Sequence, residues 1–318
     1  MLLTILLFCF SMFCLYVGAN YLVDNSASLA RKLGISALVV GLTFVAIGTS
    51  IPELFIGIVS EINHVPNLSL GNLLGASIAV LSLVLGIAAC IAPIKIHIST
   101  LQNEIPFLIL GIMLVFLLSM DGILGGLDGV LLLVFLIVYL ANTFIVSKQN
   151  RYDDQRIVDI ELTELLIIRG KKNRHYVFFI LVGAIIVAVG AHFMVETALA
   201  FAHALHVPEL LIGMTLVSIG TTLPELVTGI VSALKHHEDL ELGTLLGSAM
   251  FNMLGILGII CLLSPIAVPR TVLFIDLPVL FAIAVILYPL MRRNFVIHRY
   301  EGVILIILYC VYVAQMVF

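Results

Sequence analysis

Apolar residues fill ten stretches of this chain, and short polar segments separate them. Each stretch is about 20 residues long, which is enough for a helix to cross a hydrocarbon layer of roughly 30 Å. The pattern therefore predicts an all-α membrane protein with ten transmembrane helices, the first of them retained rather than cleaved as a signal. The predicted helices occupy residues 2–23, 37–60, 68–91, 103–119, 122–146, 174–200, 209–233, 240–263, 270–291 and 299–317.

The sequence repeats itself at an offset of 172 residues. Residues 41–54 read GLTFVAIGTSIPEL and residues 213–226 read GMTLVSIGTTLPEL, with nine of fourteen positions identical. Apolar helices match by chance at Leu and Ile, but not at a shared register of Gly, Thr, Pro and Glu. Each copy holds five predicted helices, an odd number, so the second copy enters the membrane from the opposite side and the repeats are inverted. We predict a first five-helix repeat at 1–146, a linker at 147–173 and a second, inverted repeat at 174–318.

Composition excludes several other classes of protein. Hydrophobic residues make up 62% of the 318 positions, charged residues 11%, and the mean hydropathy is +1.24, all outside the range of soluble domains. No basic soluble domain exists to bind nucleic acid. The five cysteines are scattered singly in apolar segments, which is typical of small packing residues rather than metal ligands.

The distribution of basic residues predicts the orientation of the chain. With ten helices and the N-terminus outside, 14 of the 15 Lys and Arg residues fall in the loops on one side, and only Arg270 lies on the other. Loops rich in Lys and Arg stay in the cytoplasm. Both termini are therefore predicted to lie outside, with the linker inside.

Two carboxylates lie deep within apolar segments at matched positions of the repeat, Glu53 and Glu225. A charged side chain at such depth costs about 2.5–3.5 kcal/mol on insertion scales, so its presence indicates function. Pro52 and Pro224 precede them and lack an N–H, which frees a backbone carbonyl four residues earlier. Irregular backbone at this depth is tolerated where it is buried in protein or lines a hydrated cavity, so the break predicts an ion path.

The candidate ligands around this break are all oxygen atoms. Hydroxyls come from Thr49, Ser50, Thr221 and Thr222, and the third and eighth predicted helices add Ser77, Ser248 and Asn252 as weaker candidates. Oxygen ligands suit Ca2+ or Na+, whereas zinc, copper or iron would call for His or Cys. Two adjacent buried carboxylates need a compensating cation or proton, so one Ca2+, several Na+ ions or protons can occupy the same pair in turn.

The doubled GTSxPEL segment, followed in the first copy by GNxxG, resembles the calcium/cation antiporter superfamily, and the short loops resemble its bacterial sodium/calcium exchanger branch. The resemblance covers essentially the whole chain. It implies that Glu53, Thr49, Glu225 and Thr221 coordinate Ca2+ and that Ser50 and Thr222 serve Na+. It also implies a multi-pass protein of the inner membrane that carries Ca2+ and Na+ as transported ions, with no catalytic activity, cofactor or obligate protein partner.

The sequence departs from the family pattern in its first copy. Ala76 and Val80 stand where the second copy has Ser248 and Asn252, so two expected polar ligands are missing unless Ser77 compensates. The calcium ligands are complete, but one sodium position and the coupling ion are put in question. Calcium exchange driven by protons or another cation is therefore the main alternative. A channel would need a continuous pore, and the residues of known intramembrane proteases are missing.

Overall fold

The computed structural model describes residues 2–33, 35–62, 66–154, 173–204 and 222–317, and these residues are helical almost throughout. This confirms the all-α class. The elements before the predicted linker are α1 (Leu2–Leu33), α2 (Ala37–Val40), η1 (Gly41–Val45), α3 (Ala46–Thr49), α4 (Ile51–Ile62), α5 (Pro66–Ala79), η2 (Val80–Val84), α6 (Leu85–Ile91), β1 (Ile94–Lys95), η3 (Thr100–Glu104), α7 (Ile105–Leu118), η4 (Ser119–Asp121), β2 (Ile123–Leu124) and α8 (Gly126–Asp154). The later ones are α10 (Asn173–Ala204), α13 (Leu223–Leu234), α14 (Glu238–Met250), η7 (Phe251–Ile256), α15 (Leu257–Leu263), β3 (Ile266–Ala267), η8 (Val272–Asp276), α16 (Leu277–Arg292), β4 (Val296–Ile297) and α17 (Arg299–Val317).

Within the described residues, seven helices are long and apolar enough to cross a membrane. An eighth span consists of Ala37–Thr49 and Ile51–Ile62, two helices that meet at an angle of 46°. The seventh predicted span lies partly outside the described residues, and its described part is the short apolar helix α13. The tenth is helical as α17 but is not among the seven. The protein is thus a multi-pass helical membrane protein, and the count of ten stays a prediction.

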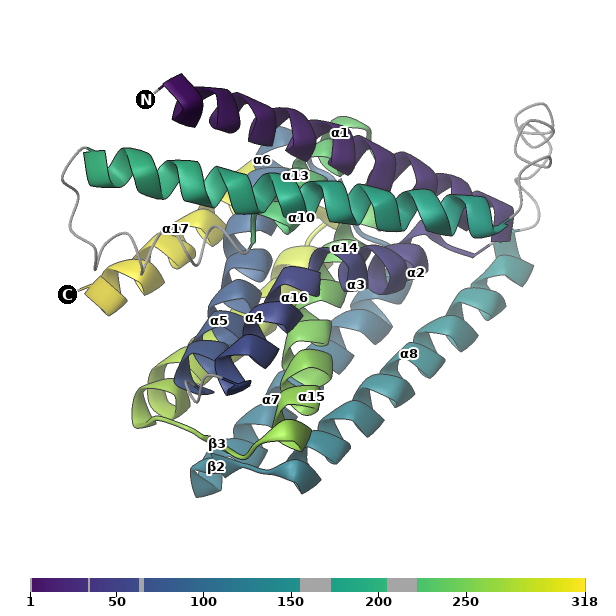
Figure 1. Ribbon diagram of the computed structural model, residues 1–318. Coiled ribbons are helices and arrows are strands. Elements are labelled where there is room, and N and C mark those ends of the chain that lie inside the picture. The colour runs from purple at the N-terminus through teal and green to yellow at the C-terminus, as the bar shows by residue number, and fades with distance from the viewer. Residues whose placement is uncertain (1, 34, 63–65, 155–172, 205–221, 318) are drawn as a thin grey trace.

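Helices α1 and α10 form a separate layer across one face of the helical bundle (Figure 1). They touch backbone to backbone at Gly18 and Gly183. A Cβ atom at either glycine would lie 2.9 Å from the carbonyl oxygen of the other, closer than real Cβ contacts allow. Small residues permit such close helix packing in membranes. The two long helices therefore act as one tightly joined pair.

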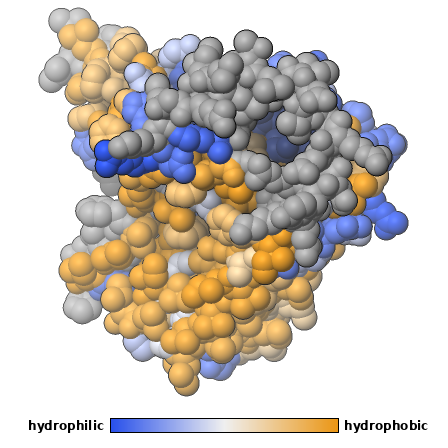
Figure 2. Space-filling model, turned by 90° about the vertical axis from the view of Figure 1, so that its right-hand side faces the viewer, coloured by the Kyte–Doolittle hydropathy of each residue, from blue (hydrophilic) through white to orange (hydrophobic). Residues whose placement is uncertain are grey.

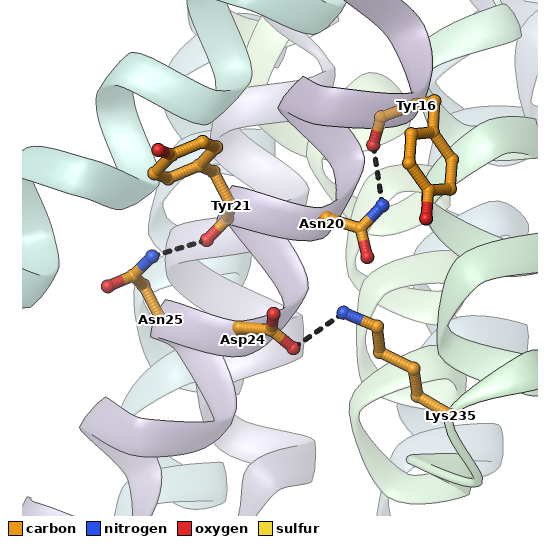
Figure 3. Close-up of polar contacts among 6 residues, drawn as sticks. All are labelled: Tyr16, Asn20, Tyr21, Asp24, Asn25 and Lys235. Atoms are coloured by element: carbon orange, nitrogen blue, oxygen red, sulfur yellow. Dashed lines mark hydrogen bonds and ion pairs between the residues drawn. The ribbon is translucent and has the colours of Figure 1, made fainter.

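A second apolar core, separate from the main core of the bundle, lies between this pair and the neighbouring bundle helices. Leu22 and Val187 pack there against Val45 and Val231 of the bundle. A polar contact also crosses the boundary, because Lys235 Nζ, just beyond the end of α13, donates to Asp24 Oδ1 of α1 at 2.7 Å (Figure 3). The layer therefore meets the bundle through mainly apolar side chains with an ion pair at one end.

Two small antiparallel sheets connect the halves of the chain. Ile94 of β1 is opposite Ile297 of β4, and Leu124 of β2 is opposite Ile266 of β3. Each sheet therefore takes one strand from each half. Ile94 and Ile266, which match at the repeat offset of 172, lie in different sheets. Similarly, α17 packs against α6 and α8 packs against α15. The two halves are therefore interlocked at several points.

The outer surface of the bundle is apolar over a wide area. On the face that includes α8, the lower part is mainly hydrophobic, with hydrophilic residues above it and a smaller hydrophilic patch at its lower end (Figure 2). Leu131, Val134, Ile137 and Val138 of α8 are all exposed there. A surface of this kind is suited to contact with lipid rather than water.

Candidate functional site

The helix of the first copy of the repeated motif is broken at Ser50, and Thr222, the matched residue of the second copy, has the same backbone conformation. Ser50, between α3 and α4, has φ −85° and ψ 7°, and Thr222, before α13, has φ −88° and ψ 2°. Pro52 and Pro224 follow within the first turn of the next helix and cannot donate a backbone hydrogen bond. The break that the sequence predicts is therefore present in the first copy, whereas the helix that precedes Thr222 in the second copy lies outside the described residues.

The two predicted carboxylates come together at these breaks. Glu53 lies in the first turn of α4 and Glu225 in the first turn of α13, and both side chains are fully buried, with 0% exposure. Ser50, three residues before Glu53, is linked through Ser248 to Glu225, so the two carboxylates belong to one buried centre. Two such carboxylates repel each other strongly in a low-dielectric interior, so the pair favours a bound cation.

A chain of hydroxyl groups connects the two halves of the site. Ser50 Oγ lies 2.9 Å from Ser248 Oγ, and Ser248 Oγ donates to Glu225 Oε1 at 3.0 Å. The hydroxyls of Thr49 and Ser50 also lie within interaction range of Glu225. Thr49 Oγ1 is directed to its own helix, with the carbonyl oxygens of Val45 and Ala46 at 3.2 and 3.3 Å.

Close helix packing places Ser248 at the break. Helix α14 crosses the bent first-half helix, and a Cβ atom at Gly247 would lie 2.7 Å from the carbonyl oxygen of Leu42. Only glycine allows this approach. Gly247 thus brings Ser248, its neighbour in the chain, against Ser50 and Glu225.

The first-half carboxylate lacks an equivalent chain. Neither oxygen of Glu53 has a hydrogen-bond partner among the described residues, and the position that matches Ser248 is the buried Ala76. Val80, also buried, takes the place of Asn252. Asn252 itself is fully buried, and neither its amide oxygen nor its nitrogen has a partner in the described part of the chain. The site is therefore asymmetric, with free ligand atoms on Glu53 and Asn252.

The remaining candidates have mixed outcomes. Ser77 is buried and donates its hydroxyl to the Leu73 carbonyl oxygen at 2.8 Å, so its proton is engaged by its own helix. Thr222 is buried at the second break. Thr221 lies outside the described residues. The ligand roles of all these residues stay predictions.

The donor set limits what kind of ion can bind. Among the residues that the structure describes, no three His, Cys, Asp or Glu side chains gather closely enough to hold a metal ion. A cation at Glu53 and Glu225 must therefore complete its shell with hydroxyl, amide and carbonyl oxygens. Ca2+ and Na+ accept such ligands readily.

Sequence reasoning missed two buried acid–tyrosine pairs. Tyr139 Oη donates to Glu104 Oε2 at 2.6 Å, and Tyr312 Oη donates to Asp276 Oδ1 at 2.9 Å. The offset of 172 places Glu104 on Asp276, and an offset of 173 places Tyr139 on Tyr312. Extending the comparison of the copies past residue 94 would have found both pairs.

These features define a helical integral membrane protein with a buried, oxygen-lined polar centre. The sequence model of the family described as "Sodium/calcium exchanger protein" matches residues 3–145 and 175–318. The chain therefore belongs to the sodium/calcium exchanger family.

Individual relatives agree with this assignment. The sodium/calcium exchanger MaX1 of Methanosarcina acetivorans is 30% identical over 322 residues, covering 92% of each chain. The inner membrane protein YrbG of Escherichia coli is 32% identical, covering 78% of this chain and 76% of its own. The crystal structure of the sodium-calcium exchanger NCX_Mj, soaked with Na+ and Sr2+, has a TM-score of 0.82 at 30% identity and covers 98% of both chains.

Proposed function

We propose that this protein exchanges Ca2+ for Na+ across the inner membrane by alternating access. The carboxylates of Glu53 and Glu225 hold the cation between the two helix breaks, and Thr49, Thr221, Ser50, Thr222, Ser248 and Asn252 supply further oxygens. The single observation that carries the proposal is the full burial of both carboxylates at one centre, where Ser248 bonds to Glu225 and contacts Ser50 of the Glu53 motif. Two negative charges match one Ca2+, and the same pair can be neutralised by monovalent cations when Ca2+ leaves.

The relatives support this choice of ions. MaX1 and NCX_Mj are named sodium/calcium exchangers, and NCX_Mj crystals were soaked with Na+ and Sr2+, a divalent cation of the same group as Ca2+. The name of YrbG supports an inner-membrane location. With ten helices and both termini outside, the basic loops lie in the cytoplasm, as the positive-inside rule requires.

The layer formed by α1 and α10 supports an alternating-access mechanism. It meets the bundle through an apolar core that includes Val187, Val45 and Val231. A surface of this kind can shift without breaking many hydrogen bonds. Movement of the pair across the central site would open the carboxylates first to one side of the membrane and then to the other.

The deciding experiment measures 45Ca uptake into proteoliposomes with imposed gradients. We expect uptake when Na+ is loaded inside and diluted outside, and no comparable uptake with K+ or proton gradients of the same size. Uptake without any counter-ion gradient would indicate a channel. Uptake that follows the proton gradient and ignores Na+ would contradict the sodium-coupled proposal.

One observation favours a second candidate, calcium exchange coupled to protons or another cation. Ala76 and Val80 stand where the second half has Ser248 and Asn252, and the oxygens of Glu53 have no partner among the described residues. A proton needs only the carboxylate oxygen, whereas a dehydrated Na+ needs several oxygens around it. The same flux assay separates the two candidates.

A further inference from the structure

A third buried carboxylate, outside the central site, belongs to Glu241 in the first turns of α14. Its exposure is 1%, and neither of its oxygens has a hydrogen-bond partner among the described residues. The position that matches it in the first half is Ser69. A serine therefore occupies the matched position of the first half, and only the second half has a carboxylate there.

The spacing along α14 directs Glu241 toward the same neighbour as Ser248 and Asn252. These residues follow Glu241 by seven and eleven positions, which keeps them on one face of a helix. That face is turned toward α13, because Ser248 contacts Glu225 and Leu245 lies against Gly229. Extending the register of these two contacts by one more turn matches Glu241 with Ser232, whose hydroxyl is buried. Seven residues of helix place Glu241 about 10 Å from Ser248 along the axis.

Lys95, His97 and Lys235, three basic groups at this end of α14, pair with acids other than Glu241. Lys95 Nζ lies 4.0 Å from Glu238, His97 Nε2 lies 3.4 Å from Asp239, and Lys235 bonds to Asp24. An ionised carboxylate buried without a partner is strongly disfavoured. Glu241 must therefore be neutralised by a proton or by a small cation that reaches it.

We propose that Glu241 is an additional binding position for a monovalent cation, Na+ in particular, between the central site and the side predicted to be cytoplasmic. The proposal rests on the proposed function. One carboxylate balances a single positive charge, and the hydroxyl of Ser232 offers a second oxygen at the same level. Because the first half has Ser69 instead, the path from the other side lacks this charge. The protein therefore binds Na+ differently from its two sides.

A binding experiment tests Glu241 apart from transport. Glu53→Gln with Glu225→Gln removes the central carboxylates, and the purified variant is heated in detergent over a range of NaCl, with choline chloride as the ionic-strength control. We expect Na+ to raise the unfolding midpoint of this double variant, since a ligand that binds the folded state stabilises it. Adding Glu241→Gln should remove that rise, whereas adding Glu196→Gln, which changes an exposed carboxylate on another helix, should leave it.

Two results would overturn the proposal. The first is a double variant that does not respond to Na+, as expected if Glu241 stays protonated. The second is a response that survives Glu241→Gln. If the triple variant does not fold, Glu241→Asp keeps the charge one methylene shorter and must at least halve or double the half-saturating Na+ concentration.

A transport experiment tests the predicted difference between the two sides. Glu241→Ser installs the residue of the first half, and half-saturating Na+ is measured separately at each face of oriented vesicles. We expect the half-saturating Na+ concentration to rise about threefold or more at the cytoplasmic face and to stay unchanged at the other face. An equal change at both faces, or at neither, contradicts the proposal. If the wild type exchanges no Ca2+ for Na+, the proposed function fails, while the unfolding experiment still decides the role of Glu241.

Discussion

The hydroxyl groups of Ser50 and Ser248 lie 2.9 Å apart although 198 positions separate them in the chain. Ser50 belongs to the break in the first copy of the motif, and Ser248 bonds to Glu225 of the second copy. A substitution at Ser50 therefore alters the hydrogen bonding of Glu225 in the other half of the site. This connection makes the pair a sensitive point for mutation.

The first prediction concerns the two carboxylates. Glu53→Gln or Glu225→Gln should each reduce 45Ca transport to below about a tenth of wild type, because each change removes a charge that Ca2+ needs. Glu196→Gln is the matched control, since Glu196 is an exposed carboxylate that pairs with His192 on its own helix. Transport above a tenth in a correctly inserted Glu53 or Glu225 variant would contradict the paired-carboxylate site.

The second prediction separates two buried serines. Ser248→Ala removes the donor to Glu225 and the contact with Ser50, so half-saturating Ca2+ should rise about tenfold, equivalent to about 1.4 kcal/mol. Ser77→Ala should have little effect, because that hydroxyl is bonded to the Leu73 carbonyl. Concentration dependence of 45Ca uptake measures both. A tenfold rise of half-saturating Ca2+ in Ser77→Ala as well would indicate that Ser77 is also a ligand.

The third prediction concerns orientation. A single cysteine at Asn150 should react with a membrane-impermeant thiol reagent only from the cytoplasm, and one at His203 only from outside, because an odd number of predicted helices separates them. The native cysteines are first replaced by alanine in an active background. Labelling of both positions from one side would contradict the inverted repeat.

The fourth prediction uses the difference between the two copies. Ala76→Ser with Val80→Asn gives the first half the polar groups of Ser248 and Asn252, which should strengthen a weak sodium position and raise the Hill slope for Na+. Calcium affinity should change less, because the carboxylates are retained. An unchanged slope in an active protein would mean that Ala76 and Val80 serve packing and do not set coupling.

The main features of the site could be predicted from sequence because they depend on local chemistry. Pro52 lacks a backbone donor, so a break beside it could be expected from residue type and from the Gly and Thr that precede it. Proline alone does not decide the matter, because Pro289 lies inside the continuous helix α16. The burial of Glu53 and Glu225 followed from their depth in apolar segments that recur at one offset. Repetition of Gly, Thr, Pro and Glu also identified the family before any contact was known.

Contacts between distant segments were harder to predict. The bond from Ser248 to Glu225 depends on how α14 crosses the bent helix at Gly247, a packing geometry that a linear pattern does not encode. The direction of the Ser77 hydroxyl also depends on its own helix, where the Leu73 carbonyl competes with any ion. Glu241 was missed because it lies near a helix end, where a carboxylate is usually solvated.

The small sheets have a consequence for how such a chain could have arisen. A single half made alone would leave Ile94–Lys95 and Ile123–Leu124 without partner strands, and α6 and α8 without the helices that cover them. Two identical halves inserted in opposite directions would restore both pairings through a two-fold axis. The inverted arrangement that we predict would make this protein equivalent to an antiparallel homodimer with its subunits joined end to end, in which Ser248 and Ala76, or Glu241 and Ser69, are free to differ.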